Sequence, residues 1–314
     1  MDYKVKMISV IICTYNRAKY IYNVLKSVAD GALPASMYEI VVVNNNSSDN
    51  TEAECRRFRL AYPNVAMVYC EEREQGLSHA RNSGIKNSSG NILVFVDDDA
   101  LVNDGYLKSY FDFFDRHEAA MAAGGPIIPL YDGCKEPLWM SHYTRQLITG
   151  KLWLGSKEKE FPGDAFPGGG NAAYRRVVFE KVGLFNVELG RKGESLIGAE
   201  EKDLFDRLKT RGLKFFYLPN SILYHLIPPT KLTDEYFERL SYSIGVSERC
   251  RTLQSGKNKY LLRIMKEMVK WCGTLVLCLW FCLSGRSCKA KKLASFRYNV
   301  TNGLTRKPCQ YTPL

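Results

Sequence analysis

The 314-residue sequence lacks several features that mark well-known protein classes. Its ten cysteines form no Cys-x-x-Cys pair and no regular framework, which is typical of a protein in a reducing compartment. The uncharged apolar run at 271–283 has thirteen residues, whereas a helix needs about 20 to cross a bilayer. The N-terminus leads into a strand-like run without the pattern of a secretory signal. Disulfide-framework, membrane-spanning and secreted proteins are therefore not expected.

Acidic residues are almost absent from one part of the chain. Residues 256–314 contain twelve of the 44 Lys and Arg residues but one of the 33 acids, Glu267. Residues 1–255 are neutral in sum, so the net charge of +11 belongs to a short C-terminal segment. Three aromatic residues of this segment, Trp271, Trp280 and Phe281, lie within its apolar run and do not alternate with the cations, so we predict no nucleic-acid partner.

The first 125 residues alternate short β-branched runs with segments of helical periodicity. The runs predict strands at 8–12, 40–43, 65–69 and 91–96. The periodic segments predict intervening helices around 21–28, opening near residues 51–52, and at 76–86. The pattern becomes irregular from about residue 124, and helical order returns at 175–182 and 200–211, followed by a strand at 214–218. The alternation predicts an α/β fold with a mostly parallel, Rossmann-like, doubly wound sheet, in which ligands bind beyond the carboxyl ends of the strands.

Three consecutive acids, Asp97, Asp98 and Asp99, follow the almost wholly apolar predicted strand at 91–96. One interpretation is a solvated acidic turn. Three adjacent anions repel one another, however, and at a strand end they are well placed to bind Mg²⁺ or Mn²⁺, which prefer oxygen ligands. We therefore favour a divalent metal site.

Three further groups have both a structural and a functional interpretation. Glu200 and Glu201 could favour a helix dipole in its first turn, or one of them could act as a general base. His225 could be a half-buried strand histidine, or it could contact a metal or phosphate. The glycines at 168–170 could form a flexible loop, or they could allow a ligand to approach the backbone closely.

The motifs occur in an order and spacing that resemble family 2 of the glycosyltransferases over residues 7–250. They are Ser9–Arg17, Val41–Asp49, Ala80–Gly84, Val96–Asp99, Gly169–Asn171 and Gly198–Glu201. The resemblance implies a GT-A fold and transfer from a nucleotide-diphosphate sugar, with inversion and with the help of Mn²⁺ or Mg²⁺. No Gly-x-Gly-x-x-Gly follows the first predicted strand, which excludes a dinucleotide-dependent oxidoreductase on a similar sheet.

The resemblance also implies roles for individual residues. The implied nucleotide-binding residues are Thr14, Tyr15, Arg17, Asn44, Asn46, Arg81, Asp97 and Asp98. The implied metal ligands are Asp99, Asp97 and His225, and the loop beside donor sugar and acceptor is Gly168, Gly169, Gly170 and Asn171. Glu201 takes the position of the catalytic base, with Glu200 as the second candidate.

Two positions depart from the family pattern. The family usually has Glu-Asp where this chain has Glu200-Glu201, so the second carboxylate is one methylene longer. Asn44 replaces an Asp that commonly contacts the base, and because an amide both donates and accepts hydrogen bonds, the preference for a particular base is open. These departures leave a non-catalytic nucleotide- or glycan-binding module as the alternative function.

The sequence predicts three segments: a nucleotide-sugar-binding half at 1–125, an acceptor-binding and catalytic half at 126–250, and a basic, amphipathic helical extension at 251–314. Cations lie on both sides of the run at 271–283. This pattern favours residues 257–297 lying on an anionic membrane surface, and the alternative is a buried helix with solvated basic ends.

We therefore expect a cytoplasmic enzyme, peripheral on the inner face of the cell membrane. It would move one sugar to a hydroxyl of a lipid-linked glycan acceptor in cell-surface polysaccharide assembly.

Overall fold

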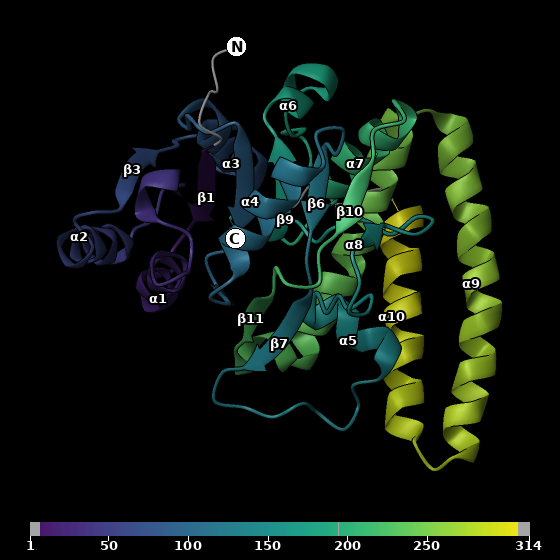
Figure 1. Ribbon diagram of the computed structural model, residues 1–314. Helices are drawn as coiled ribbons and strands as arrows, with labels where there is room; N and C mark the ends of the chain where they lie inside the picture. Colours follow the sequence, from purple (N-terminus) through teal and green to yellow (C-terminus); the bar gives the residue numbers. More distant parts are fainter. Residues whose placement is uncertain (1–6, 194, 307–314) are drawn as a thin grey trace. The chain divides into compact units, whose positions relative to one another are not determined.

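The computed structural model describes residues 7–193 and 195–306, and these form two compact units (Figure 1). The first unit comprises Met1–Leu130, Gly150–Val187 and Glu200–Leu226, and the second comprises Tyr131–Thr149, Glu188–Ala199 and Ile227–Leu314. Residues 1–6, at the start of the first predicted segment, and residues 307–314, at the end of the third, lie outside the described residues. Cys309 is among them. The division at residues 125 and 250 stays a prediction.

The first unit is built on an eight-stranded sheet of order β3-β2-β1-β4-β9-β6-β10-β8. Its strands are β1 (Ile8–Thr14), β2 (Tyr38–Asn44), β3 (Ala66–Glu71), β4 (Ile92–Val96), β6 (Ala122–Gly124), β8 (Lys159–Glu160), β9 (Asn171–Arg175) and β10 (Phe215–Tyr217). β1 pairs in parallel with β2 and β4, and β2 pairs in parallel with β3. β9 is antiparallel to both β4 and β6. The sheet is mixed, and its N-terminal half is parallel as predicted.

A second, three-stranded sheet has the order β5-β11-β7, with strands β5 (Ala100–Val102), β7 (Ile127–Tyr131) and β11 (Leu223–Ile227). β5 begins directly after the three acids and is antiparallel to β11, so that Ala100 lies opposite His225. This pairing connects the end of β4 to a strand more than 120 residues later in the chain.

Helices cover both faces of the large sheet, as the sequence predicts. Alternate side chains of β1 divide between two cores: Ile8, Val10 and Ile12 pack on one side, and Ile11 packs on the other. The first core includes helices α1 (Ala18–Ala29), α2 (Thr51–Ala61) and α4 (Tyr106–Arg116). The second includes helices α3 (Leu77–Lys86), α6 (Val177–Val182) and α7 (Glu200–Thr210).

The predicted elements of the first 125 residues match the structure to within a few residues. The helix predicted from Arg175 begins at Val177, because Arg175 still pairs with Ile92 at the end of β9. The irregular stretch after residue 124 contains strands of two to five residues, too short to show a clear alternation of apolar and polar side chains.

The second unit contains the helices α5 (His142–Thr149), α8 (Asp234–Gln254), α9 (Lys257–Leu283) and α10 (Ser287–Thr305), with a short 3₁₀ turn at Pro229–Leu232. Another 3₁₀ turn, Ala35–Met37, precedes β2 in the first unit. α8 and α10 cross at two glycines: a Cβ on Gly245 would lie 2.1 Å from the Val300 carbonyl oxygen, and one on Gly303 would lie 2.1 Å from that of Tyr242. Only glycine permits backbones to approach this closely.

Candidate active site

The predicted site residues gather at one edge of the large sheet, within the first unit. Thr14, Asn44 and Val96 end the parallel strands β1, β2 and β4. The chain enters β1 between β2 and β4, so this is the point at which the strand order reverses. Ligands of open α/β sheets bind in the crevice at such a point, beyond the carboxyl ends of the strands.

The loops after β1 and β2 are tied together by hydrogen bonds. The Asn16 amide donates to Ser47 Oγ at 2.9 Å, and the Ser48 amide donates to Asn16 Oδ1 at 2.8 Å. The Arg17 amide donates to Thr51 Oγ1 at 3.1 Å, at the first turn of α2. Asn16 has a φ of 53°, a left-handed conformation that Asn tolerates better than most residues. The loop that carries Tyr15 and Arg17 is therefore held by the neighbouring loop.

The side chain of Tyr15 is 39% exposed, whereas Thr14 is buried. Tyr15 is therefore available to stack against a ligand, and Thr14 is available only at the base of the site. The buried Thr14 Oγ1 has no hydrogen-bond partner among the described residues.

Asn44 uses both ends of its amide within the protein. Its Nδ2 donates to the Tyr69 hydroxyl at 2.9 Å, and its Oδ1 accepts from the Ser47 amide at 2.9 Å. Asn44 thereby closes the turn after β2. Asn46, with a φ of 64°, donates to the Arg73 carbonyl at 2.6 Å and lies in the exposed part of the same loop. Contacts of either residue with a nucleotide stay predictions.

Asp98 and Asp99 face Arg17 and His225. Arg17 Nε lies 3.6 Å from Asp98 Oδ1, and Arg17 Nη2 lies 3.7 Å from Asp99 Oδ2. His225 Nε2 lies 3.5 Å from Asp99 Oδ1, and the Leu226 amide donates to the Asp99 carbonyl at 2.9 Å. The pairing of β5 with β11 therefore brings His225 to the carboxylates, as the resemblance implies.

Burial raises the pKa of Asp98 to about 7, although the positive charge of Arg17 opposes the shift and the charge of Asp99 adds to it. The pKa of Asp97 is raised as well, chiefly because protein atoms surround its carboxylate, and Arg81 opposes this shift. Nearly half of the Asp97 side chain, 46%, is accessible to solvent, which screens the effect on this residue. A cation bound here would relieve the repulsion between the acids.

Arg81, on α3, binds the two glutamates at the start of α7. Its Nη1 lies 2.8 Å from Glu200 Oε1 and its Nη2 lies 2.9 Å from Glu201 Oε1, while Asp97 Oδ1 is 3.9 Å from Nη2. The Arg81 side chain is only 3% exposed. Burial would lower its pKa, but attraction by Glu201, Glu200 and Asp97 outweighs burial and raises it, so the guanidinium stays charged. Sequence reasoning placed Arg81 at the nucleotide, and the structure joins it to the carboxylates.

The glycine loop lies directly against these carboxylates. A Cβ on Gly169 would lie 1.8 Å from Glu201 Oε1, and one on Gly170 would lie 2.0 Å from Asp97 Oδ2. A Cβ on Gly168 would meet the side chain of Ile127. Positions 169 and 170 therefore need glycine because acidic side chains approach the backbone there, and the approach of a ligand stays a prediction.

Asn171 lies in the interior and every polar atom of its side chain is bonded. The hydroxyls of Tyr106 and Tyr110 each donate to its Oδ1 at 2.8 Å. Its Nδ2 donates to the Pro126 carbonyl at 2.8 Å and to the Ser221 carbonyl at 3.0 Å. The side chain is fully buried and fixes the start of β9 after the glycine loop. A contact of its backbone with donor or acceptor stays a prediction.

A comparison with protein families identifies the family to which this chain belongs. The model of "Glycosyl transferase family 2" matches residues 9–183, more than half of the chain. The chain belongs to glycosyl transferase family 2. The resemblance drawn from the sequence motifs is confirmed.

Curated relatives of this glycosyltransferase agree with the assignment. It is 23% identical to the glucosyl-dolichyl phosphate glucuronosyltransferase of Haloferax volcanii over 82% of this chain and 83% of that protein. It is 34% identical to the poly(ribitol-phosphate) beta-N-acetylglucosaminyltransferase TarS of Staphylococcus aureus, over 35% of this chain and 19% of that longer protein. The glycosyltransferase AglE of Haloferax volcanii is 42% identical over 32% of this chain and 33% of its own length.

Solved structures show that the fold is GT-A. The mannosyltransferase PcManGT of Pyrobaculum calidifontis, in complex with GDP-Man and Mn²⁺, matches with a TM-score of 0.62 at 18% identity, over 93% of this chain and 86% of that one. Residues 1–349 of S. aureus TarS in complex with UDP-GlcNAc match with a TM-score of 0.51 at 17% identity, over 94% and 91%. At these identities the likeness shows the fold alone.

The donor set of the glycosyltransferase suits a hard divalent cation. Asp97 and Asp99 supply carboxylate oxygens and His225 supplies an imidazole nitrogen. In the described part of the chain, no group of three or more His, Cys, Asp or Glu side chains is arranged as a preformed metal site. A metal held by Asp97, Asp99 and His225 stays a prediction.

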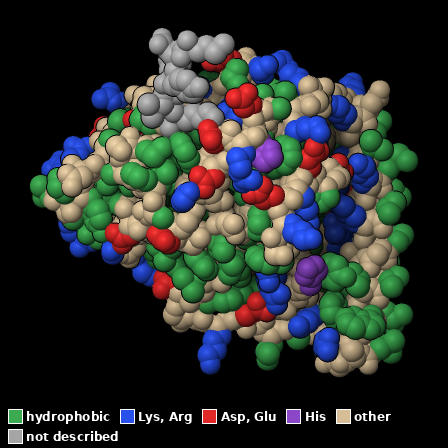
Figure 2. Space-filling view, viewed as in Figure 1, with side chains coloured by type: hydrophobic (Ala, Val, Ile, Leu, Met, Phe, Trp, Pro, Cys, Tyr) green, Lys and Arg blue, Asp and Glu red, His purple; other side chains and the backbone are tan. Residues whose placement is uncertain are grey.

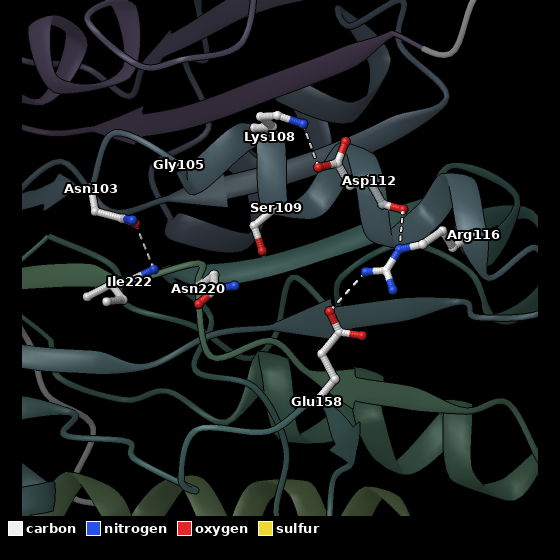
Figure 3. A pocket seen from close by; sticks show the side chains of 9 residues that line it. All are labelled: Asn103, Gly105, Lys108, Ser109, Asp112, Arg116, Glu158, Asn220 and Ile222. Carbon is white, nitrogen blue, oxygen red and sulfur yellow. Dashed lines mark hydrogen bonds and ion pairs between the residues drawn. The ribbon is translucent and has the colours of Figure 1, made fainter.

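A pocket of about 390 Å³ also opens on the first unit, and none of the predicted site residues lines it (Figure 3). Its charged side chains pair with each other: Lys108 Nζ with Asp112 at 2.7 Å, and Arg116 with Glu158 at 3.0 Å. Asn103 Oδ1 accepts from the Ile222 amide at 2.9 Å. Because the charges are already paired, we assign no function to this pocket.

Sequence reasoning missed Asn45, which is buried in the loop after β2. Its Nδ2 donates to the carbonyls of Glu72 and Glu74 at 2.8 and 2.9 Å, and its Oδ1 accepts from the Gly76 amide at 2.7 Å. Asn45 thus fixes the segment that leads into α3, the helix of Arg81. Its position between two Asn residues of the family motif was the available signal.

Proposed function

We propose that this glycosyltransferase moves one sugar, with inversion, from a nucleotide-diphosphate sugar to a hydroxyl of a glycan acceptor. The observation that supports this most is the cluster of Arg81 with Glu200, Glu201 and Asp97 at the carboxyl end of β4. In this cluster, a glutamate carboxylate that can accept a proton lies next to Asp97, which would face the nucleotide. Displacement at an anomeric carbon needs both groups in one place.

Glu201 is the proposed base. Its side chain is 24% exposed, whereas that of Glu200 is 3% exposed, so a hydroxyl of an acceptor can reach Glu201 but not Glu200. Glu200 shares the buried guanidinium of Arg81 and would serve to hold it. Ala199, directly before the pair, has a φ of 79°, which is costly for a residue other than glycine. Strain of this kind often marks functional positions.

In the proposed step, Glu201 takes the proton of the acceptor hydroxyl as its oxygen attacks the anomeric carbon. The bond from that carbon to the diphosphate oxygen breaks, and its electron pair leaves with the diphosphate. Attack from the side opposite to the leaving group inverts the anomeric centre. Arg17, beside Asp98 and Asp99, supplies positive charge close to where the leaving oxygen would develop negative charge.

The nucleotide is proposed to bind along the loops after β1 and β2, with the exposed ring of Tyr15 against the base. Thr14, Arg17, Asn44, Asn46, Asp97 and Asp98 complete the proposed nucleotide site. A divalent cation, Mn²⁺ or Mg²⁺, would be held by Asp99, with Asp97 and His225, and would supply Lewis-acid stabilisation of the leaving diphosphate. The glycines at 168–170 would lie beside donor sugar and acceptor.

We further propose a lipid-linked acceptor and a place on the cytoplasmic face of the cell membrane. The support comes from the Haloferax relative, whose name refers to glucosyl-dolichyl phosphate, and from the basic segment at 257–297. The relative TarS, whose name refers to poly(ribitol-phosphate), supports the proposed role in cell-surface polysaccharide assembly. Within the described residues, no helix is both long and apolar enough to cross a membrane.

The testing experiment is calorimetric titration with UDP, GDP, dTDP and CDP, each with and without Mn²⁺. We expect one nucleotide to bind with a strong dependence on Mn²⁺ and expect Asp99→Ala to abolish that dependence. Asp112→Ala, which removes an acid from the unrelated pocket, is the matched control and should bind like the wild type. With the donor so identified, Glu201→Gln should keep nucleotide binding and lose sugar transfer. Absence of binding to every nucleotide would overturn the proposal, and binding without transfer in the wild type would favour the non-catalytic module.

A further inference from the structure

The helix α9 of the second unit buries polar side chains and exposes apolar ones. Its buried residues are Arg263, Glu267, Thr274 and Phe281. Ten large apolar side chains on the same helix are between 52% and 80% exposed: Leu261, Leu262, Met265, Met268, Val269, Leu275, Val276, Leu279, Trp280 and Leu283. This is the reverse of the usual distribution on a surface helix.

The exposed apolar side chains form one continuous stripe. They recur at intervals of three and four residues from Leu261 to Val269 and again from Leu275 to Leu283, and at 100° per residue they occupy an arc of about 140°. At 1.5 Å per residue the stripe is about 35 Å long. Figure 2 shows hydrophobic side chains gathered along the edge where Figure 1 places α9. A patch of this length on a soluble protein marks a surface that something apolar covers.

The polar inner face explains why α9 cannot turn over to bury the stripe. Arg263 Nε lies 2.9 Å from Oε2 of Glu248, on α8, and Arg263 Nη1 lies 2.7 Å from Glu267 Oε2. Glu267 Oε1 lies 2.8 Å from Nη1 of Arg297, on α10. These pairs are almost fully buried, so rotating α9 would break them and leave charges without partners. The orientation of the apolar stripe is therefore fixed by the ion pairs behind it.

The charges beside the stripe identify its occupant. Lys259, Lys266 and Lys270 are exposed and, at 100° per residue, lie about 40–80° beyond one edge of the arc. The single acid of α9, Glu267, is buried and paired. Two copies joined through this face would bring like charges together, whereas an anionic lipid surface would neutralise them.

We infer that the outward face of α9 lies in the plane of an anionic membrane, with its apolar stripe inserted and its lysines at the headgroups. This inference deepens the proposed function, because it names the surface that would hold the enzyme beside a lipid-linked acceptor. It rests on the proposed function only where it assigns that surface to the membrane that carries the acceptor. The stripe lies within the segment 257–297 predicted from the sequence. The stripe begins ten residues before 271, and Trp271 faces inward, where its Nε1 donates to Thr301 Oγ1 at 3.0 Å.

The experiment is flotation of the full chain with vesicles of phosphatidylcholine alone or with 30% phosphatidylglycerol. We expect the wild type to float with the anionic vesicles. Met265→Glu/Val269→Glu places two anions at the middle of the stripe and should reduce the bound fraction about tenfold or more. Lys266→Gln/Lys270→Gln should weaken binding and reduce its dependence on salt. Leu138→Glu, which changes an 88% exposed leucine of the same unit, is the matched control and should float like the wild type.

Two further readouts separate this inference from its alternatives. Circular dichroism should show that all variants keep the helical content of the wild type, because each changed side chain is exposed. Light scattering should show that the wild type and Met265→Glu/Val269→Glu have the same mass without lipid. Absence of flotation, flotation unaffected by the two glutamates, or a wild-type dimer that these glutamates dissociate would each overturn the inference. Transfer to a water-soluble acceptor should survive the α9 changes, so failure of the membrane inference leaves the catalytic proposal standing.

Discussion

Gly169 and Glu201 touch: a Cβ on Gly169 would lie 1.8 Å from Glu201 Oε1 and 2.3 Å from its Cδ. The two residues are 32 positions apart in the sequence, and α7 delivers the carboxylate to the glycine loop. The position of the proposed base is therefore set by the absence of a side chain at 169.

Gly169→Ala is expected to displace the Glu201 carboxylate and to lower kcat by about a hundredfold, because a shift of about 1 Å in a catalytic group has an effect of this size. Nucleotide affinity should change little. The control is Gly105→Ala, since a Cβ there would meet only Asn103 Nδ2 at an ordinary 3.7 Å. Steady-state kinetics with both substrates checks the prediction, and an unchanged kcat in Gly169→Ala would contradict it.

Replacing Arg81 should damage stability as well as transfer. Arg81→Met removes the buried guanidinium that faces Glu200, Glu201 and Asp97, and loss of one partner in a buried ion cluster costs about 3–5 kcal/mol. We expect urea unfolding to show a loss of this order. Adding Glu200→Gln to Arg81→Met should restore part of it, because one buried anion is removed.

Arg56→Met is the comparison for that series. Arg56 pairs with Glu52 on the surface of α2 and its side chain is 74% exposed, so its loss should change the free energy of unfolding by less than about 0.5 kcal/mol. Equal losses in the free energy of unfolding for Arg81→Met and Arg56→Met would show that the Arg81 cluster contributes no more to stability than an exposed ion pair.

Asn171→Ala should be strongly destabilising although no charge is lost. It leaves the hydroxyls of Tyr106 and Tyr110 and the carbonyls of Pro126 and Ser221 without their buried partner. Each such group costs about 1–3 kcal/mol, and relaxation of the site makes a total of about 3–5 kcal/mol reasonable. Thermal unfolding measures the loss. A melting temperature within one or two degrees of the wild type would contradict the assigned structural role.

The packing of α9 should weaken in acid through Glu267. Burial would raise the pKa of Glu267, but hydrogen bonds from Arg297 and Arg263 outweigh burial and hold it below the usual 4.5. The ionised form is thus favoured in the folded state. Its contribution is complete above pH 4.5 and is lost as the pH falls through the lower, folded-state pKa. Backbone amides of α9 should therefore exchange hydrogen faster, relative to their intrinsic rates, at pH 3 than at pH 6.

Glu267→Gln tests the assignment. The variant should show weaker protection of α9 amides than the wild type at pH 6, and the difference between the two proteins should shrink toward pH 3. Glu52→Gln, on the exposed surface of α2, should show no such difference. A constant gap between wild type and Glu267→Gln at every pH would assign the acid sensitivity to other carboxylates.

Much of the fold could be predicted from local sequence. The apolar runs at β1, β2 and β4 and the periodic spacing of Ile21, Val24 and Val28 in α1 predicted the parallel half of the sheet correctly. The strands after residue 124 could not be predicted, because strands of two to five residues show no clear period and owe their positions to pairing with distant partners.

The sequence by itself determined the family, the GT-A fold, and the residues that gather at the sheet edge. These motifs follow predicted strands, and the carboxyl ends of parallel strands meet at one edge of a sheet. Only the tertiary structure decided what these residues touch. Arg81 and Glu201 lie 120 positions apart, and their contact depends on the packing of α3 and α7 on one face of the sheet. Likewise, the sequence predicted a basic, amphipathic helical extension, but the ion pairs of Glu267 decide which side of α9 faces outward, because buried charges must keep their partners.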